Sequence, residues 1–352
     1  MTPIAIAIAI AGRPIGPTHP PYIIAEMSGN HNGDIGRALA LIDAAKAAGA
    51  DAVKLQTYTA DTITIDHDGP GFVIEGGLWD GRRLYELYQE AHTPWDWHPR
   101  LFDHAAEIGI ACFSSPFDPT AVDFLNSLGA PAFKVASFEI VDTPLVAAMT
   151  RTGKPLIIST GLASPEDITE AVSTAREAGG EQLILLHCTS GYPTPAAQMH
   201  LRTMMDLGAA HGTLVGLSDH TMGTAVSVAA VALGACVIEK HFTLARADGG
   251  PDSAFSLEPD ELGRLVRDCR DAWEALGQVH YEEVSAEAAS RDHRRSLYVV
   301  ADVKAGEVLT EANVRSIRPG FGMPPKHFYA VLGRAARRDL KRGEPLDWGM
   351  VE

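Results

Sequence analysis

Two short polar segments, Ser218 to His220 and Glu239 to His241, each follow a short apolar run of the chain. The runs are Leu214 to Leu217 and Ala235 to Ile238, and a helical stretch separates them. If both runs are parallel strands of one barrel, the two histidines stand at the carboxyl ends of their strands, where such barrels carry their active sites. Two imidazoles then face one site, where they would serve as acid and base or bind a metal.

Six further apolar runs end at polar residues in the same way, which gives eight predicted strands. They are Tyr22–Ala25, Ala52–Val53, Gly109–Phe113, Ala132–Phe133, Pro155–Ile158, Gln182–Leu186, Leu214–Leu217 and Ala235–Ile238. Helical patterns lie between them, such as Ala38–Gly49, Trp97–Gly109 and Ser164–Gly179. Eight strands alternating with helices over about 250 residues predict an α/β protein with a (β/α)8 TIM barrel. The alternative is an open doubly wound sheet, but no Gly-x-Gly-x-x-Gly motif follows any of these strands.

The chain has 352 residues, of which 46% are hydrophobic, and it exceeds one barrel by enough for a second, small domain. Its net charge of -16 opposes binding to nucleic acid or to an anionic membrane, because both require an excess of cations. We therefore expect no nucleic acid and no membrane among its partners. An anionic small-molecule substrate is compatible with this charge if lysines and arginines cluster locally.

The four cysteines are Cys112, Cys188, Cys236 and Cys269, and they show neither metal-type pairs nor a disulfide framework. Two fall inside predicted strands and Cys188 follows closely after a third, and a buried thiol at such a place acts as a small apolar filler. This usage indicates a reducing compartment, so we expect a cytoplasmic protein. The apolar start, Met1 to Ala11, has no basic leader, and Arg13 interrupts it too early for a membrane span. We interpret it as an amino-terminal strand.

A change in sequence pattern marks the second domain. The predicted helix Pro259–Leu276 ends at Gly277, and an acidic, weakly patterned stretch follows over Glu282–Asp292. Short strands are then expected at Leu297–Val300, Val303–Glu307, Asn313–Arg318 and Leu340–Glu344. We place the barrel at residues 1–281, a linker at 282–294 and the small domain at 295–352. A unit of this size buries little core, so we expect it to dock on another surface.

Lys54 and Lys134 follow predicted strands and therefore point into the barrel mouth, where a lysine is costly unless it meets an anion. Four serines follow neighbouring strands, namely Ser115, Ser137, Ser159 and Ser218. Two lysines with four hydroxyls favour a cradle for a phosphate and a carboxylate. For either lysine alone, the alternatives are a structural ion pair or a Schiff-base lysine.

His220 and His241, with Glu239 nearby, are candidate ligands of a divalent metal. A single strand-end histidine is more often a hydrogen-bonding group or an acid/base, whereas a pair on adjacent strands favours a metal. With two imidazoles and oxygen ligands the site would be open, which suits Mn²⁺ or Mg²⁺ better than structural Zn²⁺. Open positions leave room for a substrate oxygen or for water.

Several motifs occur in one characteristic order along the chain. They are Ala25–Gly33, Lys54–Thr57, Ser159–Gly161, Tyr192–Pro193, Ser218–Thr221, Glu239–Thr243 and Gly250–Asp252. In this order they resemble the bacterial sialic acid synthase family over nearly the whole chain. The small carboxyl-terminal unit, with Arg318-Pro319-Gly320, resembles the antifreeze-like (SAF, β-clip) domain of that family.

The resemblance implies condensation of phosphoenolpyruvate with the open-chain aldehyde of an N-acetylated amino sugar, giving a nonulosonic acid and phosphate. It implies that His220 and His241 bind the metal. The residues that it assigns to phosphoenolpyruvate are Lys54, Lys134, Ser115, Ser137, Ser159 and Ser218. Those that it assigns to the sugar and the reaction site are Glu26, Gln56, Glu139, Tyr192, Glu239 and Asp252, of which the three glutamates are expected to act in catalysis with the two histidines.

The resemblance also implies a domain-swapped homodimer. In it, Arg318 would reach an N-acetyl group of the sugar in the partner's barrel, because the neighbouring proline and glycine fix the backbone and leave the guanidinium free. The alternative is an arginine that only pairs with the acidic surface.

Two departures from the general family pattern concern substrate recognition. Where sialic acid synthases carry asparagine, this chain has Ser190, which we keep as a candidate substrate contact. The segments Gly77–Tyr85 and Thr93–Trp97 resemble the pseudaminic acid synthase branch more than the N-acetylneuraminate branch. The alternative is an insert whose aromatic residues only dock on the barrel. The branch resemblance implies 2,4-diacetamido-2,4,6-trideoxy-L-altrose as the sugar.

Other functions stay open at this point. Synthases for N-acetylneuraminate, legionaminate or a spore-coat sugar are the nearest alternatives. A catalytically silent barrel whose small domain binds a glycan or a partner would be expected to have lost strand-end residues, yet Lys54, Lys134, His220 and His241 are all present. A metal-dependent hydrolase leaves the paired lysines without an obvious use.

Overall fold

The computed structural model describes residues 8–352, which form two compact units. The first unit ends at Gly277, and the second comprises Gln278–Glu352. The domain limits expected from the sequence, at residues 281 and 294, stay predictions.

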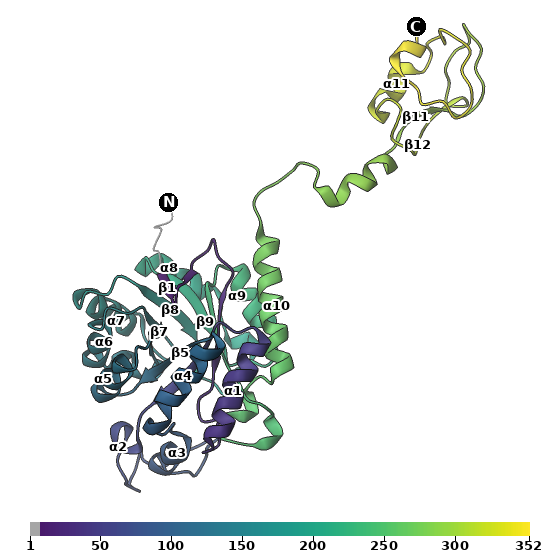
Figure 1. Cartoon of the computed structure of the whole chain (residues 1–352). Helices are drawn as coiled ribbons and strands as arrows, with labels where there is room; N and C mark the ends of the chain where they lie inside the picture. The colour runs from purple at the N-terminus through teal and green to yellow at the C-terminus, as the bar shows by residue number, and fades with distance from the viewer. Residues whose placement is uncertain (1–7) are drawn as a thin grey trace. The chain divides into compact units, whose positions relative to one another are not determined.

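The first unit is a closed barrel of eight parallel strands, as predicted (Figure 1). The strands are β3 (Tyr22–Glu26), β4 (Ala52–Thr57), β5 (Ala111–Pro116), β6 (Phe133–Val135), β7 (Leu156–Ser159), β8 (Leu183–Cys188), β9 (Leu214–Ser218) and β10 (Val237–His241). Each strand pairs with the next one in the chain, and β10 closes the ring by pairing with β3. The register places His241 beside Glu26 on one side of β10 and Glu239 beside Ser218 on the other.

Helices cover the outside of the barrel (Figure 1). They are α1 (Ile35–Ala48), α4 (His98–Ile108), α5 (Pro119–Ser127), α6 (Thr143–Thr150), α7 (Pro165–Glu177), α8 (Arg202–His211), α9 (Ala225–Ala232) and α10 (Pro259–Leu276). The helices α1 and α4 stop at Gly49 and Gly109, whose φ angles of 90° and 73° are left-handed and favour glycine. The short helices α2 (Ala60–Ile63) and α3 (Leu84–Ala91) pack together in an insert between β4 and α4.

The interior of the barrel changes from apolar to polar along each strand. Ile24, Phe113, Ile157 and Val237 belong to one buried apolar cluster near the amino-terminal ends of their strands. Two residues further along the same strands stand Glu26, Ser115, Ser159 and Glu239, which are also buried. Because successive side chains of a strand alternate between its two faces, these residues continue the same inward-facing rows. The apolar layer therefore forms a floor under a polar mouth.

A small hairpin packs against the apolar floor. It consists of β1 (Ile8–Ile10) and β2 (Arg13–Ile15), joined by a tight turn at Ala11 and Gly12. Ile8, Ile10 and Ile15 are buried in the same cluster as the floor. The predicted strand over Met1 to Ala11 is thus confirmed only for Ile8–Ile10, where it is one arm of a hairpin. Residues 1–7 lie outside the described part of the chain.

The second unit is built on two antiparallel strands, β11 (Ser296–Val299) and β12 (Val314–Ile317), with a short helix α11 (Phe328–Val331). Its core contains Leu297, Val314 and Leu346. The expected strands at Val303–Glu307 and Leu340–Glu344 were wrong: only Val303 and Leu340 form a single bridge. Each segment turns back at once, because Glu307 N bonds to Lys304 O and Glu344 N bonds to Lys341 O.

Two further features concern the expected linker and the membrane. A fully exposed 3₁₀ helix over Ser285–His293 occupies most of the segment that we expected to be a linker. In the described range 8–352, no helix combines the length and the apolar character needed to cross a bilayer.

Candidate active site

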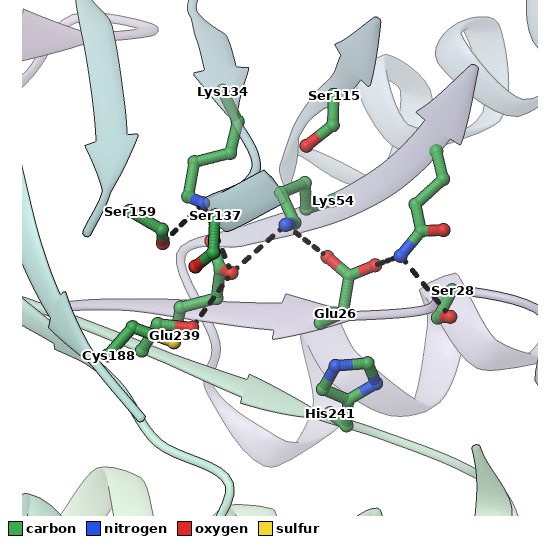
Figure 2. A network of polar contacts seen from close by, with 12 residues as sticks. Glu26, Ser28, Lys54, Ser115, Lys134, Ser137, Ser159, Cys188, Glu239 and His241 are labelled. Carbon is green, nitrogen blue, oxygen red and sulfur yellow. Dashed lines mark hydrogen bonds and ion pairs between the residues drawn. The ribbon is translucent and has the colours of Figure 1, made fainter. Parts of the chain in front are cut away.

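The carboxyl ends of the strands bring the predicted site residues of the barrel together, and Figure 2 shows the two lysines with Glu26, Glu239 and the serines around them. They contribute Glu26 from β3, Lys54 and Gln56 from β4, Ser115 from β5, Lys134 from β6, Ser159 from β7, Ser218 from β9, and Glu239 and His241 from β10. Ser137 and Glu139 follow on the 3₁₀ helix Ser137–Val141. The strand residues among them face inward at the ends of their strands, which is why residues far apart in the sequence meet here.

Lys54 lies between two carboxylates. Its Nζ atom is 2.8 Å from Oε2 of Glu26 and 3.0 Å from Oε1 of Glu239. Lys54 is 4% exposed. Burial lowers the pKa of its ammonium group to about 8, although the Glu239 carboxylate opposes this shift. Lys54 is therefore held by ion pairs to two carboxylates. Its pKa lies only about one unit above neutral pH.

Lys134 approaches the same carboxylate from the other side. Its Nζ atom donates to Oγ of Ser159 at 2.6 Å and lies 3.8 Å from Oε1 of Glu239. Burial favours the neutral form of Glu239, but the two lysines together hold the pKa of its carboxyl below the ordinary value. The two lysines and the two carboxylates thus form one balanced network with no net charge.

Several polar atoms at the mouth have no hydrogen-bond partner within the described residues, and three of them matter here. They are Oγ of Ser115, Oγ of Ser190 and Oε2 of Glu139, all buried. A buried polar atom without a hydrogen bond costs free energy unless something else satisfies it. These atoms therefore suit a bound polar ligand. Burial also raises the pKa of the Glu139 carboxyl to about 7, despite the nearby lysines.

Gly161 brings a backbone amide to the same place and was not among the predicted site residues. Its N–H donates to Oγ of Ser137 at 3.2 Å. A Cβ atom at Gly161 would overlap Oγ of Ser190 and would lie 2.7 Å from Oγ of Ser137. Only glycine leaves room for the two hydroxyls, and the sequence signal for this was its position two residues after Ser159 at a strand end.

The two histidines lie side by side, with ring centroids 5.3 Å apart. Nδ1 of His220 is 3.0 Å from the carbonyl oxygen of Thr189 and must donate to it, so Nε2 is the nitrogen that can bind a metal when the ring is neutral. Burial lowers the pKa of His220, but contact with Cys188 outweighs this and raises it above the ordinary value. Nδ1 of His241 is buried and has no hydrogen-bond partner among the described residues. Burial lowers the pKa of His241 well below its ordinary value, so its imidazole is neutral. The ring of His241 is thus in the neutral state that a metal ligand needs, and His220 has the orientation of a ligand and would release its extra proton when a metal binds.

These residues fit an open metal site rather than a closed one. Nowhere in residues 8–352 do three or more His, Cys, Asp or Glu side chains gather as a ready-made metal cluster. A metal at the pair would therefore take its other ligands from water or substrate, which is typical of catalytic sites.

Aromatic rings surround the histidines. The ring centroid of Tyr192 lies 4.5 Å from that of His220 and 5.0 Å from that of Phe255, and Phe255 lies 4.8 Å from His241. Phe255 is 1% exposed. We did not identify it from the sequence, where a lone phenylalanine after Asp252 gives no signal distinct from an ordinary core residue.

Asp252 joins the network through a residue that sequence reasoning missed. The hydroxyl of Ser28 donates to Oδ2 of Asp252, and Nε2 of Gln56 donates to Oε1 of Glu26 at 3.0 Å and to Oγ of Ser28 at 3.3 Å. Burial raises the pKa of the Asp252 carboxyl. Ser28 has a φ of 51°, an uncommon backbone conformation for serine that directs the loop after β3 toward this contact.

Cys188 corrects our expectation that the strand cysteines are only apolar fillers. Its Sγ atom lies 3.9 Å from Nδ1 of His220. Burial opposes ionisation of this thiol, but contact with His220 lowers its pKa to about 7. By contrast, burial raises the pKa values of Cys112 and Cys236, as expected for fillers.

The middle residues of the two polar segments point away from the mouth. Nζ of Lys240 lies 2.8 Å from Oδ2 of Asp219, and Oγ of Ser227 donates to the same oxygen at 2.6 Å. This buried pair ties β9 and β10 to α9 on the outside of the barrel. Alternation along the strand therefore separates a structural lysine from the two lysines of the mouth.

Arg318 belongs to the second unit, where it is exposed and precedes Pro319. Its predicted role toward a sugar stays a prediction.

Comparisons with known proteins agree with this geometry. The model of the NeuB family matches residues 41–281, and that of the SAF domain matches residues 294–352. A relative named pseudaminic acid synthase, from Campylobacter jejuni, is 45% identical over 93% of this chain and 96% of its own length. Another of that name, from Helicobacter pylori, is 41% identical over 95% of this chain and 98% of its own.

A solved structure supports the same grouping. The N-acetylneuraminic acid (sialic acid) synthetase of Leptospira borgpetersenii superposes with a TM-score of 0.71 at 31% sequence identity. The match covers 81% of this chain and 94% of that one.

Proposed function

The chain belongs to the NeuB family, and we propose that it is a pseudaminic acid synthase. It condenses phosphoenolpyruvate with 2,4-diacetamido-2,4,6-trideoxy-L-altrose to give pseudaminic acid and phosphate. One observation carries the proposal: Lys54 and Lys134 converge on Glu239 in a chain 41–45% identical to enzymes of that name.

Phosphoenolpyruvate is the natural occupant of the lysine network. Its phosphate and carboxylate would replace the carboxylates that now pair with Lys54 and Lys134. The free hydroxyls of Ser115 and Ser190 supply hydrogen bonds that no protein group takes up in the described chain. An anion bound here would also restore the full charge of Lys54, because it raises the pKa of that ammonium group.

The carboxylates act once the anion is in place. A carbon–carbon bond forms between C3 of phosphoenolpyruvate and the aldehyde carbon of the sugar, and the aldehyde oxygen takes up a proton. The positive charge that develops at C2 is stabilised by Glu26 and Glu239. Water then adds to C2 and gives one proton to Glu139. The C2–O bond to phosphate breaks, the remaining hydroxyl proton leaves with the phosphate, and a keto group is left at C2.

A divalent cation, Mn²⁺ or Mg²⁺, held by His220 and His241 would supply a Lewis acid for the aldehyde oxygen. The chain itself orients the two rings. The Thr189 carbonyl fixes His220, and Tyr192 and Phe255 pack against both histidines.

We also propose that the protein is a cytoplasmic homodimer in which the second unit of one subunit completes the sugar site of the other. Four free, buried cysteines support a reducing compartment. The small core of the second unit supports a docked position, and the resemblance to the family suggests the partner's barrel.

The test is release of phosphate from phosphoenolpyruvate with a panel of N-acetylated sugars. We expect turnover of 2,4-diacetamido-2,4,6-trideoxy-L-altrose to exceed that of N-acetylmannosamine and of the legionaminate precursor by far. The opposite preference would assign the chain to the sialic or legionaminic acid synthases. No turnover of any sugar would favour a silent barrel that binds a glycan or a partner.

A further inference from the structure

The insert between α2 and α3 folds back on itself. Ile74 N donates to Arg82 O at 2.9 Å, and Gly81 N donates to Ile74 O at 2.8 Å. Gly76 and Gly77, with φ angles of 79° and 77°, form the turn because glycine adopts this backbone without strain. The resulting loop carries Trp79 near its tip.

Trp79 connects three loops of the barrel mouth. Its indole N–H donates to the carbonyl oxygen of Pro251, in the loop after β10, at 2.9 Å. Its ring centroid lies 5.6 Å from that of Tyr192, in the loop after β8. The insert that follows β4 is therefore held against the candidate site by one side chain.

Tyr192 continues this contact into the site. Its ring packs on His220 at 4.5 Å and on Phe255 at 5.0 Å between centroids. Phe255 is fully buried, whereas Tyr192 and Trp79 are half-buried. Phe255, Tyr192 and Trp79 thus form one row of aromatic rings, here called the aromatic wall, that extends from the histidine pair outward to Trp79.

The outer end of this wall is apolar. The one polar atom of Trp79 is already bonded to the Pro251 carbonyl, so the indole has only carbon to offer a ligand. A hydroxyl pressed against this surface would lose its hydrogen bonds to water without gaining a partner, whereas a methyl group would lose nothing. The wall therefore favours a ligand whose outer end lacks a hydroxyl.

We infer that Trp79, supported by Tyr192, is the residue that selects a sugar with a deoxy carbon at C6. The inference rests on the proposed function, in which the aldehyde carbon reacts beside His220 and His241. The far end of the open-chain sugar then extends outward along the wall, and its C6 methyl group lies against the indole.

The experiment compares 2,4-diacetamido-2,4,6-trideoxy-L-altrose with its 6-hydroxy counterpart, 2,4-diacetamido-2,4-dideoxy-L-altrose. The full chain is assayed for kcat/KM with each sugar by phosphate release. Wild type should prefer the deoxy sugar by about 100-fold, which is typical of an apolar pocket that meets an added hydroxyl. In Trp79→Ala the preference should fall below about tenfold, through a higher KM for the deoxy sugar, while the KM for phosphoenolpyruvate stays unchanged. Trp79→Phe keeps an apolar ring and should retain most of the preference.

Trp95 provides a matched control. Its indole N–H also donates to a backbone carbonyl, that of Tyr58, at 3.2 Å, and its ring stacks on Phe124. Trp95→Ala should therefore change kcat/KM for the two sugars by the same factor. The preference for the deoxy sugar should stay as in wild type. If wild type turns over the deoxy sugar and Trp79→Ala keeps the full preference, the assignment of Trp79 is wrong and the proposed function stands. If wild type turns over neither sugar, the proposed function fails and the assignment with it.

Discussion

Lys54 and Glu239 form a buried ion pair, with 3.0 Å between Nζ and Oε1, in which Lys54 also separates Glu239 from Glu26. Replacement of Lys54 by Met leaves two buried carboxylates facing each other. We expect a loss of about 3–5 kcal/mol in the free energy of unfolding, measured in urea, because a broken buried pair leaves uncompensated charge.

The double variant Lys54→Met/Glu239→Gln separates this structural effect from function. It should recover much of the lost stability, since it removes one of the two carboxylates, yet it should show no phosphate release. An unchanged stability of the single variant would contradict the role of Lys54 in this network.

Lys134 is expected to matter more for activity than for stability. In Lys134→Ala, Glu239 keeps its pair with Lys54, so the melting temperature should change little. The value of kcat/KM for phosphoenolpyruvate should fall by about 100-fold or more, because a charge-assisted contact in a dry site is lost. Lys240→Ala is the control: it breaks the outer pair with Asp219 and should lower the melting temperature without changing the KM for phosphoenolpyruvate.

The raised pKa of Glu139 predicts how kcat/KM for the sugar falls at acidic pH. Burial raises the pKa of this carboxyl to about 7, so it is ionised above that pH and protonated below it. Since the proposed mechanism needs a carboxylate, kcat/KM for the sugar should fall about tenfold per pH unit below 7. Phosphoenolpyruvate is kept saturating, because its own phosphate titrates. Glu139→Gln should lower the rate and abolish this fall, and a fall that persists in the variant would assign it to another group.

The histidine pair predicts a metal requirement. Exhaustive chelation should abolish phosphate release, and Mn²⁺ or Mg²⁺ should restore it. His220→Ala and His241→Ala should stay inactive with added metal, with circular dichroism like that of wild type. His187→Ala is a matched control, because this buried histidine of β8 bonds to the Met199 carbonyl, at 2.5 Å, and does not belong to the pair. Full activity after metal removal would contradict the assignment.

The fold and most of the site could be predicted from one rule: the polar residues that follow the apolar run of a barrel strand line the mouth of the barrel. Apolar runs located all eight strands, and most of the polar residues after them face one mouth, with Asp219 and Lys240 among the exceptions. The rule failed where a strand continued beyond its apolar run. The run at Gln182–Leu186 suggested that His187 begins the polar end of β8, but β8 extends to Cys188. Alternation then turns His187 outward and Cys188 toward His220.

Other contacts had no sequence signal, since they depend on loop geometry. Ser28 reaches Asp252 across 224 positions of the chain, and Trp79 reaches Pro251 across 172. Periodicity within a single element cannot predict such contacts, because the loops that make them have no repeating pattern.

Arg318 gives the last prediction, which concerns assembly. We propose that its guanidinium completes the sugar site of the partner's barrel, on the ground that it is exposed and belongs to the small unit rather than to the barrel. A mixture of Arg318→Ala and His220→Ala proteins, each inactive alone, should then recover activity. Each heterodimer has one site with both groups intact, so random subunit exchange should give about a quarter of the wild-type rate.

A second mixture provides the control for this test. Lys134→Ala and His220→Ala both alter the barrel, so no heterodimer of these two proteins contains an intact site, and the mixture should stay inactive. Subunit exchange is checked in both mixtures with two affinity tags. Confirmed exchange without recovery in the Arg318→Ala mixture would mean that Arg318 acts within its own subunit or only pairs with surface carboxylates.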